Sequence, residues 1–185
     1  ELSKSAKITP TAIEFVDIAG LVRGAHEGEG LGNKFLSHIR AVDAIAHVVR
    51  FFEDQDIQHV ENKIDPLSDA ATIETELALA DLQLVTKVLE RAQKDARGHD
   101  QQVAARAAVL EKLHQHLADG QPARTLTLDP VEQSSIADLM VLTSKPTLYI
   151  ANLSEQQIKQ ATVITASFAK HHAPVLPLNI KIARQ

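Results

Sequence analysis

The sequence predicts an α/β domain that is interrupted by a helical insertion. Short apolar and β-branched runs at 12–17, 43–52, 146–152 and 174–182 are typical of strands. They alternate with segments of helical periodicity, an order that favours a parallel sheet packed against helices. Between 65 and 127 the apolar residues recur every three or four positions, which instead indicates long amphipathic helices.

The flanking elements are expected in a strand–loop–helix order. The strand at 12–17 is followed by a loop that contains four glycines, and then by a helix at 34–42. The near-continuous apolar run at 43–52 is typical of a parallel strand that is covered on both faces. After the insertion, the strand at 146–152 precedes a helix at 156–171 and the last strand at 174–182.

The insertion is predicted to be an antiparallel hairpin of two helices. The first begins at Asp65-Pro66 and is broken at Gly98, while Asp100 can cap the second helix, which ends at Gly120. A short polar turn between two amphipathic helices favours this arrangement. The predicted domains are therefore an α/β domain formed by 1–64 and 128–185, and a coiled-coil insertion formed by 65–127.

Composition excludes several classes of protein. The 185 residues carry a net charge of −5, which gives no general electrostatic case for nucleic acid and no sign of DNA specificity. No apolar run is long enough to cross a membrane, and the chain has neither a signal peptide pattern nor a cysteine. These features favour a cytoplasmic protein. Because the sequence starts at Glu1 and stops at Gln185, we expect it to be a segment of a longer chain.

The first candidate site is Asp17-Ile-Ala-Gly20, directly after the first predicted strand. In nucleotide-hydrolysing switches, a carboxylate at this place holds the Mg²⁺ shell and the glycine amide hydrogen-bonds the γ-phosphate. Glycine is required because the backbone approaches the phosphate closely. The alternative is a turn that merely ends a strand, and the short motif alone does not separate the two interpretations.

The second candidate site is Asn152-Leu-Ser-Glu155, which also follows an apolar strand. Guanine-specific proteins carry Asn-Lys-x-Asp at the corresponding place, and its final carboxylate accepts two hydrogen bonds from the guanine edge. Here Leu153 and Glu155 replace the lysine and the aspartate. The longer carboxylate disfavours guanine and favours relaxed or adenine-preferring recognition. The alternative is that Asn152 or Ser154 caps the following helix.

Several longer strings of the sequence resemble the YchF, or Obg-like ATPase, family of P-loop NTPases. They are FVDIAGLV (15–22), GEGLGNKFL (28–36), HVVRFFE (47–53), IDPL (64–67), ETELALAD (74–81) and KPTLYIANLSE (145–155). The strings occur in the order of the family and cover nearly the whole chain. The resemblance implies a Ras-like α/β domain that carries a coiled-coil insertion.

The resemblance also implies an activity and its site. The full-length protein is expected to bind and hydrolyse ATP with Mg²⁺, with GTP less favoured, and to associate with the ribosome or ribosomal RNA. Asp17, Gly20, Asn152, Leu153 and Glu155 are the expected nucleotide-binding residues, and Asp17 is expected to hold Mg²⁺ through water. The glycines of the loop are expected to form a switch that orders around the γ-phosphate; they are Gly24, Gly28, Gly30 and Gly32.

The catalytic group is less obvious from the sequence. Leu21 occupies the place where many GTPases carry a glutamine that orients the attacking water. His59 is the candidate replacement, since a neutral imidazole can orient water or accept its proton; the alternative is an ordinary surface histidine. The phosphate-loop string Gly-x-x-x-x-Gly-Lys-Ser/Thr is absent. The resemblance places it before Glu1 and a TGS domain after Gln185, so we expect this segment alone to be inactive.

A second function is compatible with the same sequence. Near the predicted turn of the hairpin, cationic residues outnumber Glu90 and Asp95 by two; they are Lys87, Arg91, Lys94 and Arg97. Such a patch can contact RNA phosphate weakly, although two amphipathic helices are more often a rigid structural arm. The alternative function is therefore a helical module that binds protein or RNA on a noncatalytic α/β scaffold.

Overall fold

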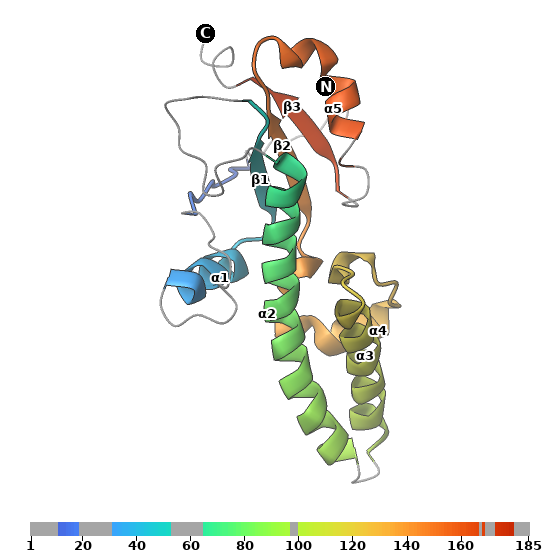
Figure 1. Ribbon diagram of the computed structural model, residues 1–185. Coiled ribbons are helices and arrows are strands. Elements are labelled where there is room, and N and C mark those ends of the chain that lie inside the picture. Colours follow the sequence, from blue (N-terminus) through green and yellow to red (C-terminus); the bar gives the residue numbers. More distant parts are fainter. Residues whose placement is uncertain are drawn as a thin grey trace, which may run out of the picture.

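The computed structural model describes residues 11–18, 31–52, 65–96, 100–166, 168 and 173–179. Its helices and strands are α1 (Leu31–Ala41), β1 (Ile45–Arg50), α2 (Pro66–Asp95), α3 (Gln101–Ala118), α4 (Pro130–Ile136), β2 (Thr147–Asn152), α5 (Ala161–Ala166) and β3 (Val175–Leu178). Short 3-10 turns are η2 (Ala123–Thr125), η3 (Ala137–Leu139), η4 (Leu142–Ser144) and η5 (Gln157–Gln160). A small sheet lies at one end of the molecule, and α2 extends well beyond it beside α3 (Figure 1). No helix in these ranges is long and apolar enough to cross a membrane.

The three strands form a parallel sheet in the order β1-β2-β3. Ile45 is in register with Thr147, and Tyr149 is in register with Val175. The expected parallel sheet is thereby confirmed for these three strands. Because parallel strands all end at the same edge, the residues that follow β1, β2 and β3 are neighbours in space.

The described helices cover only one face of this sheet. Val49 and Tyr149 point to that face and pack with Ala70 of α2 and with Phe168. On the opposite face, Val48 remains 54% exposed and Leu176 of β3 remains 46% exposed. The expectation that the 43–52 run is covered on both faces is therefore wrong for the described part of the chain. An apolar run indicates that burial of the strand is favourable, but it does not determine whether another element packs on each face of the strand.

The two long helices begin at the residues that their capping signals indicated, and α3 also ends as expected, whereas the predicted break at Gly98 lies outside the described residues. The Asp65 carboxylate accepts a hydrogen bond from the Ser68 amide, and Asp100 caps α3 by accepting from the Gln102 amide. Just beyond the end of α3, Gly120 has a φ of +73°, a left-handed conformation that glycine adopts without strain. Along their length α2 and α3 share an apolar cluster; its buried members from the two helices are Val85, Leu89, Ala92, Ala107, Leu110, Leu113 and Leu117.

The helix α4 was not predicted from the sequence. It begins with a capping box, in which Asp129 accepts from the Glu132 amide while the Glu132 side chain accepts from the Asp129 amide. It lies beside α3, where Lys112 pairs with Glu132 and Arg106 pairs with Asp138 of η3 at 2.8 Å. The helical layer therefore continues past residue 127.

The predicted strand at 12–17 is absent. Residues 11–18 form no regular element, and the Ile13 and Phe15 side chains are 78% and 83% exposed. Only Ile18 packs against a core cluster, the one between α1 and α2. A strand requires a neighbour that pairs with its backbone amides and carbonyls, and no described strand pairs with this segment. The apolar pattern of 12–17 therefore indicates a preference for strand structure, but no described strand pairs with this segment.

Three smaller differences concern element boundaries. The predicted helix at 156–171 is present as η5 and α5, which ends at Ala166. The described part of the last strand ends at Leu178, whereas 180–182 lie outside the described residues. Gly32, expected in the switch loop, lies in the first turn of α1. Glycine is a poor helix former, so a glycine count overestimated the length of the loop.

A buried carboxylate joins α2 to the chain just before β2. Asp81 is fully buried and accepts hydrogen bonds from the Leu142 amide at 2.8 Å and the Thr143 amide at 2.7 Å. The Thr143 hydroxyl donates a third bond at 2.8 Å. Burial raises the pKa of Asp81, and the hydrogen bonds from Thr143 and Leu142 partly offset this effect. This Asp81 clamp fixes η4, and hence the start of β2, against the middle of α2.

We predict that Asp81→Ala lowers the free energy of unfolding by about 3 kcal/mol or more, because three buried donors lose their acceptor. Denaturant unfolding monitored by circular dichroism measures the change. Asp95→Ala, at an exposed position on the same helix, is the matched control and should change stability by less than about 0.5 kcal/mol. Equal effects of the two substitutions would contradict the assignment.

Candidate nucleotide-binding site

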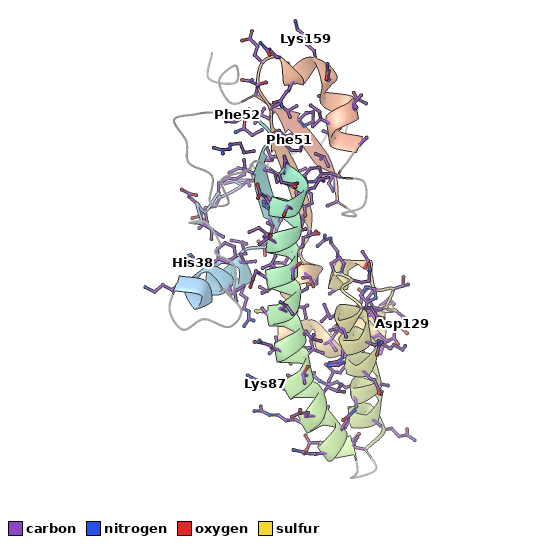
Figure 2. All side chains as sticks on the ribbon, viewed as in Figure 1. His38, Phe51, Phe52, Lys87, Asp129 and Lys159 are labelled. Atoms are coloured by element: carbon purple, nitrogen blue, oxygen red, sulfur yellow. The ribbon has the colours of Figure 1, made fainter. Side chains whose placement is uncertain are left out.

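The candidate site lies at the carboxyl edge of the sheet, where the chain leaves β1, β2 and β3. In open α/β sheets this edge is where ligands bind. The Phe51 amide donates to the Asn152 carbonyl at 3.0 Å, and the Leu153 amide donates to the Leu178 carbonyl at 2.8 Å. Next to them, the Arg50 guanidinium lies 5.9 Å from the centre of the Phe52 ring. Figure 2 shows Phe51 and Phe52 near this end of the molecule.

The turn formed by 152–155 is held from both sides by amide side chains. Asn179, which follows β3 and is buried, donates from Nδ2 to the Leu153 carbonyl at 2.9 Å. On the other side, Gln157 donates from Nε2 to the Phe51 carbonyl at 2.9 Å. Its Oε1 accepts from the Ser154 amide at 2.9 Å. The backbone of the turn is therefore fixed to β1 and β3 as well as to its own strand.

The predicted site residues within the turn have different surroundings. Glu155 is exposed, so its carboxylate is available to a ligand at the edge. Leu153 is only 1% exposed, so its side chain belongs to the core and only its backbone faces the turn. Ser154 and Gln157 make the two contacts of a capping box, since the Ser154 hydroxyl accepts from the Gln157 amide at 3.3 Å, but the N-cap of η5 itself is Gln156, which makes no side-chain cap bond. Capping and base recognition are compatible, because they use different residues of the turn.

The phosphate end of the predicted site is only partly described. Asp17 is exposed, and its carboxylate has no ion pair among the described residues. Mg²⁺ usually keeps several waters and binds one or two carboxylates together with substrate phosphates. A single accessible carboxylate fits that pattern, and no larger cluster of metal-ligating side chains occurs in the described ranges. Five predicted residues besides Leu21 lie outside the described residues; they are Gly20, Gly24, Gly28, Gly30 and His59.

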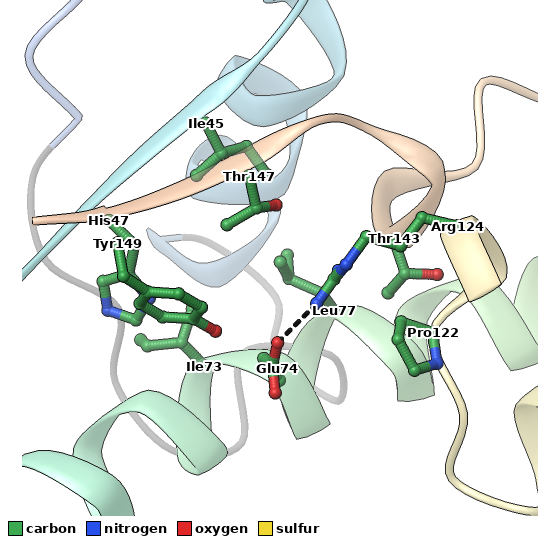
Figure 3. A pocket seen from close by; sticks show the side chains of 10 residues that line it. All are labelled: Ile45, His47, Ile73, Glu74, Leu77, Pro122, Arg124, Thr143, Thr147 and Tyr149. Atoms are coloured by element: carbon green, nitrogen blue, oxygen red, sulfur yellow. Dashed lines mark hydrogen bonds and ion pairs between the residues drawn. The ribbon is translucent and has the colours of Figure 1, made fainter. Parts of the chain in front are cut away.

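A small hollow lies at the other end of the strands, between α2, the start of the sheet and the turn η2 (Figure 3). The Arg124 guanidinium bonds the Glu74 carboxylate at 2.6 Å, and both side chains are largely buried. Burial and the neighbouring Glu74 carboxylate raise the pKa of the Tyr149 hydroxyl. His47 packs against the Tyr149 ring, with 5.2 Å between ring centres. The lining is otherwise mainly apolar, so this hollow is a junction between helix and sheet.

Gln157 is a residue of the candidate site that sequence reasoning missed. The spacing of Ser154 and Gln157 is that of a capping box and could have indicated it. The contact between Asn179 and Leu153 could not be read locally, because the two residues lie 26 positions apart in the chain.

The sequence of this chain is similar to that of several known proteins. Residues 2–81 match the family described as 50S ribosome-binding GTPase. The "Ribosome-binding ATPase YchF" of Haemophilus influenzae is 52% identical over 155 residues, which are 84% of this chain and 43% of that protein. The Bacillus subtilis protein of the same name is 49% identical over 85% of this chain and 43% of its own length. "Obg-like ATPase 1" of Oryza sativa subsp. indica is 40% identical over 86% of this chain and 41% of its own.

A solved structure agrees with these matches. The Schizosaccharomyces pombe YchF GTPase superposes with a TM-score of 0.71 and 38% identity, over 88% of this chain and 46% of that one. The sheet and the sequence match together define a Ras-like domain of the P-loop GTPase class. Within that class, the chain belongs to the YchF, or Obg-like ATPase, family. It spans less than half the length of the relatives that it matches.

The burial of Leu153 generates a prediction. Leu153→Lys should lower the free energy of unfolding by about 3 kcal/mol, because it places an ammonium group in the core without a partner. Gln156→Lys introduces the same charge at an exposed position of the adjoining segment and should change stability by less than about 0.5 kcal/mol. Thermal and denaturant unfolding measure both; a Leu153→Lys protein of wild-type stability would show that this side chain is accessible.

Proposed function

We propose that this chain forms the central part of a nucleotide-dependent switch that binds and hydrolyses ATP with Mg²⁺, with GTP less favoured. The observation that carries the proposal is the turn at 152–155, which is held rigidly at the carboxyl edge of a parallel sheet and presents an exposed Glu155. Relatives named as ribosome-binding ATPases support the choice of ATP.

Within this proposal each predicted residue has a role. Asp17 holds the Mg²⁺ shell through water, and the Gly20 amide contacts the γ-phosphate. When bound, the metal neutralises charge that develops on the transferring phosphoryl group. Glu155 and the backbone of Leu153 contact the base, together with Asn152. His59 orients the attacking water. Gly24, Gly28 and Gly30 lie in the segment that rearranges when the γ-phosphate leaves, and Gly32 follows it in the first turn of α1.

We also propose the division into domains. The α/β domain consists of 1–64 and 128–185, and 65–127 forms an antiparallel coiled-coil insertion. Two observations support the coiled-coil insertion: α2 and α3 share an apolar cluster, and the two helices are in contact along their length. The arm so formed carries the contact to ribosomal RNA, which would place the protein in the cytoplasm.

The positive charge on the arm favours ribosomal RNA as its partner. It also favours the alternative function, a helical module that binds RNA on a noncatalytic scaffold. Lys87, Arg91 and Lys94 are exposed on α2 at helical spacing, and Lys87 points away from α3 (Figure 2). Arg97, the fourth predicted cation, lies outside the described residues. The ion pairs of the described chain lie elsewhere. If the α/β part binds no nucleotide, these cations make the arm a phosphate-binding module on a scaffold.

Nucleotide binding by the full-length protein tests the proposal. Titration with ATP and GTP, with and without Mg²⁺, should show tighter binding of ATP and Mg²⁺-dependent release of phosphate. Absence of binding to either nucleotide, with retained binding to ribosomes, would favour the alternative.

The base contact gives a first prediction for this function. Glu155→Asp should shift the ATP:GTP affinity ratio toward GTP by about five-fold, since a shorter carboxylate can meet the guanine edge and one hydrogen bond contributes about 1 kcal/mol. Competition binding with both nucleotides measures the ratio. Glu111→Asp, an exposed residue of α3, is the control. An unchanged ratio in Glu155→Asp would remove this side chain from base selection.

The catalytic assignment gives a second prediction. His59→Ala should lower turnover about a hundred-fold and leave ATP affinity nearly unchanged, because water positioning acts mainly in the transition state. Steady-state phosphate release measures turnover, and His38→Ala, an exposed histidine on α1, is the control. Wild-type turnover in His59→Ala would make His59 an ordinary surface residue.

A further inference from the structure

The backbone of the turn after β2 has an unusually complete set of partners. The Asn152 carbonyl accepts from the Phe51 amide, and the Leu153 amide donates to the Leu178 carbonyl. The Leu153 carbonyl accepts from Asn179, and the Ser154 carbonyl accepts from the Ile158 amide at 3.1 Å. The position of the turn is therefore defined by several independent hydrogen bonds, while the Glu155 side chain stays exposed.

Gln157 differs from the other partners because it joins two strand ends with one side chain. Its Oε1 accepts from the Ser154 amide and its Nε2 donates to the Phe51 carbonyl, both at 2.9 Å. Phe51 directly follows β1, so this side-chain amide adds a second link between the end of β1 and the turn that carries Glu155, besides the bond from the Phe51 amide to the Asn152 carbonyl. Ordinary helix capping requires only the Ser154 contacts and does not explain the bond to Phe51.

We infer that Gln157 is a positioning residue for base selection: by joining the Phe51 carbonyl to the Ser154 amide, it holds the Glu155 carboxylate where it discriminates adenine from guanine nucleotides. This inference rests on the proposed function, in which Glu155 contacts the base. Discrimination between two bases depends on hydrogen bonds that tolerate displacements of only about 0.5 Å. Without the Gln157 side chain the turn keeps its backbone bond at Asn152, but Ser154 and the adjoining Glu155 lose their link to Phe51 and with it that placement.

Two substitutions separate this role from capping. Gln157→Leu removes both side-chain bonds. Gln157→Glu retains an acceptor for the Ser154 amide and suits a capping box, but it cannot donate to the Phe51 carbonyl. The added charge acts alike on the triphosphates of ATP and GTP, and Gln157→Leu, which adds no charge, controls for a direct effect of the new carboxylate on the two bases. Gln156→Leu is the matched control, because Gln156 is exposed and adjoins Gln157.

The experiment measures Mg²⁺-dependent affinities of the full-length protein for ATP and GTP by competition, and the melting temperature without nucleotide. We expect both Gln157 variants to change the ATP:GTP affinity ratio by about five-fold toward GTP, with the control at the wild-type ratio. A wild-type ratio in Gln157→Glu, or equal losses of both affinities in step with a lowered melting temperature, would overturn the inference and leave a capping role. A wild-type protein that binds neither nucleotide would instead overturn the proposed function itself.

Discussion

The hydrogen bonds to Asp81 are the interaction on which the arrangement of this molecule depends. They join the middle of α2 to the turn that leads into β2, two segments about sixty residues apart in the chain. An ionised carboxylate is costly to bury, and three convergent donors are what make its burial tolerable. The arm and the sheet are thereby held in one geometry. Nearby, the Glu74–Arg124 pair joins α2 to η2.

The helix α2 belongs to both parts of the molecule. Its first turns pack near Phe51, at the end of β1 where the candidate site lies, and its last turns form the outer part of the arm. A single 30-residue helix is stiff over this length. The same helix therefore links the surroundings of the candidate site to the outer part of the arm.

The site itself shows how a parallel sheet supplies a platform for recognition. The carboxyl ends of β1, β2 and β3 lie side by side. The side-chain amides of Gln157 and Asn179 fix the turn at 152–155 between the ends of β1 and β3. Affinity and selectivity in such a site come from small polar groups on a rigid frame. The sheet remains open on the face that carries Val48 and Leu176.

Much of this molecule follows from local sequence signals, and the rest required the tertiary structure. The caps Asp65 and Asp100, the left-handed Gly120 and the periodicity of α2 and α3 are local, because each depends on residues within a turn or two of its own position. The motifs at Asp17 and Asn152 likewise indicated the family without coordinates. The pairing of the 12–17 segment could not be read locally, because a strand exists only where another segment meets its backbone. Likewise, only the folded chain determined that Leu153 is core, that Asp81 joins helix to sheet, and that Gln157 reaches Phe51. These are contacts between distant residues, and side-chain pattern alone does not specify which distant residue will be the partner.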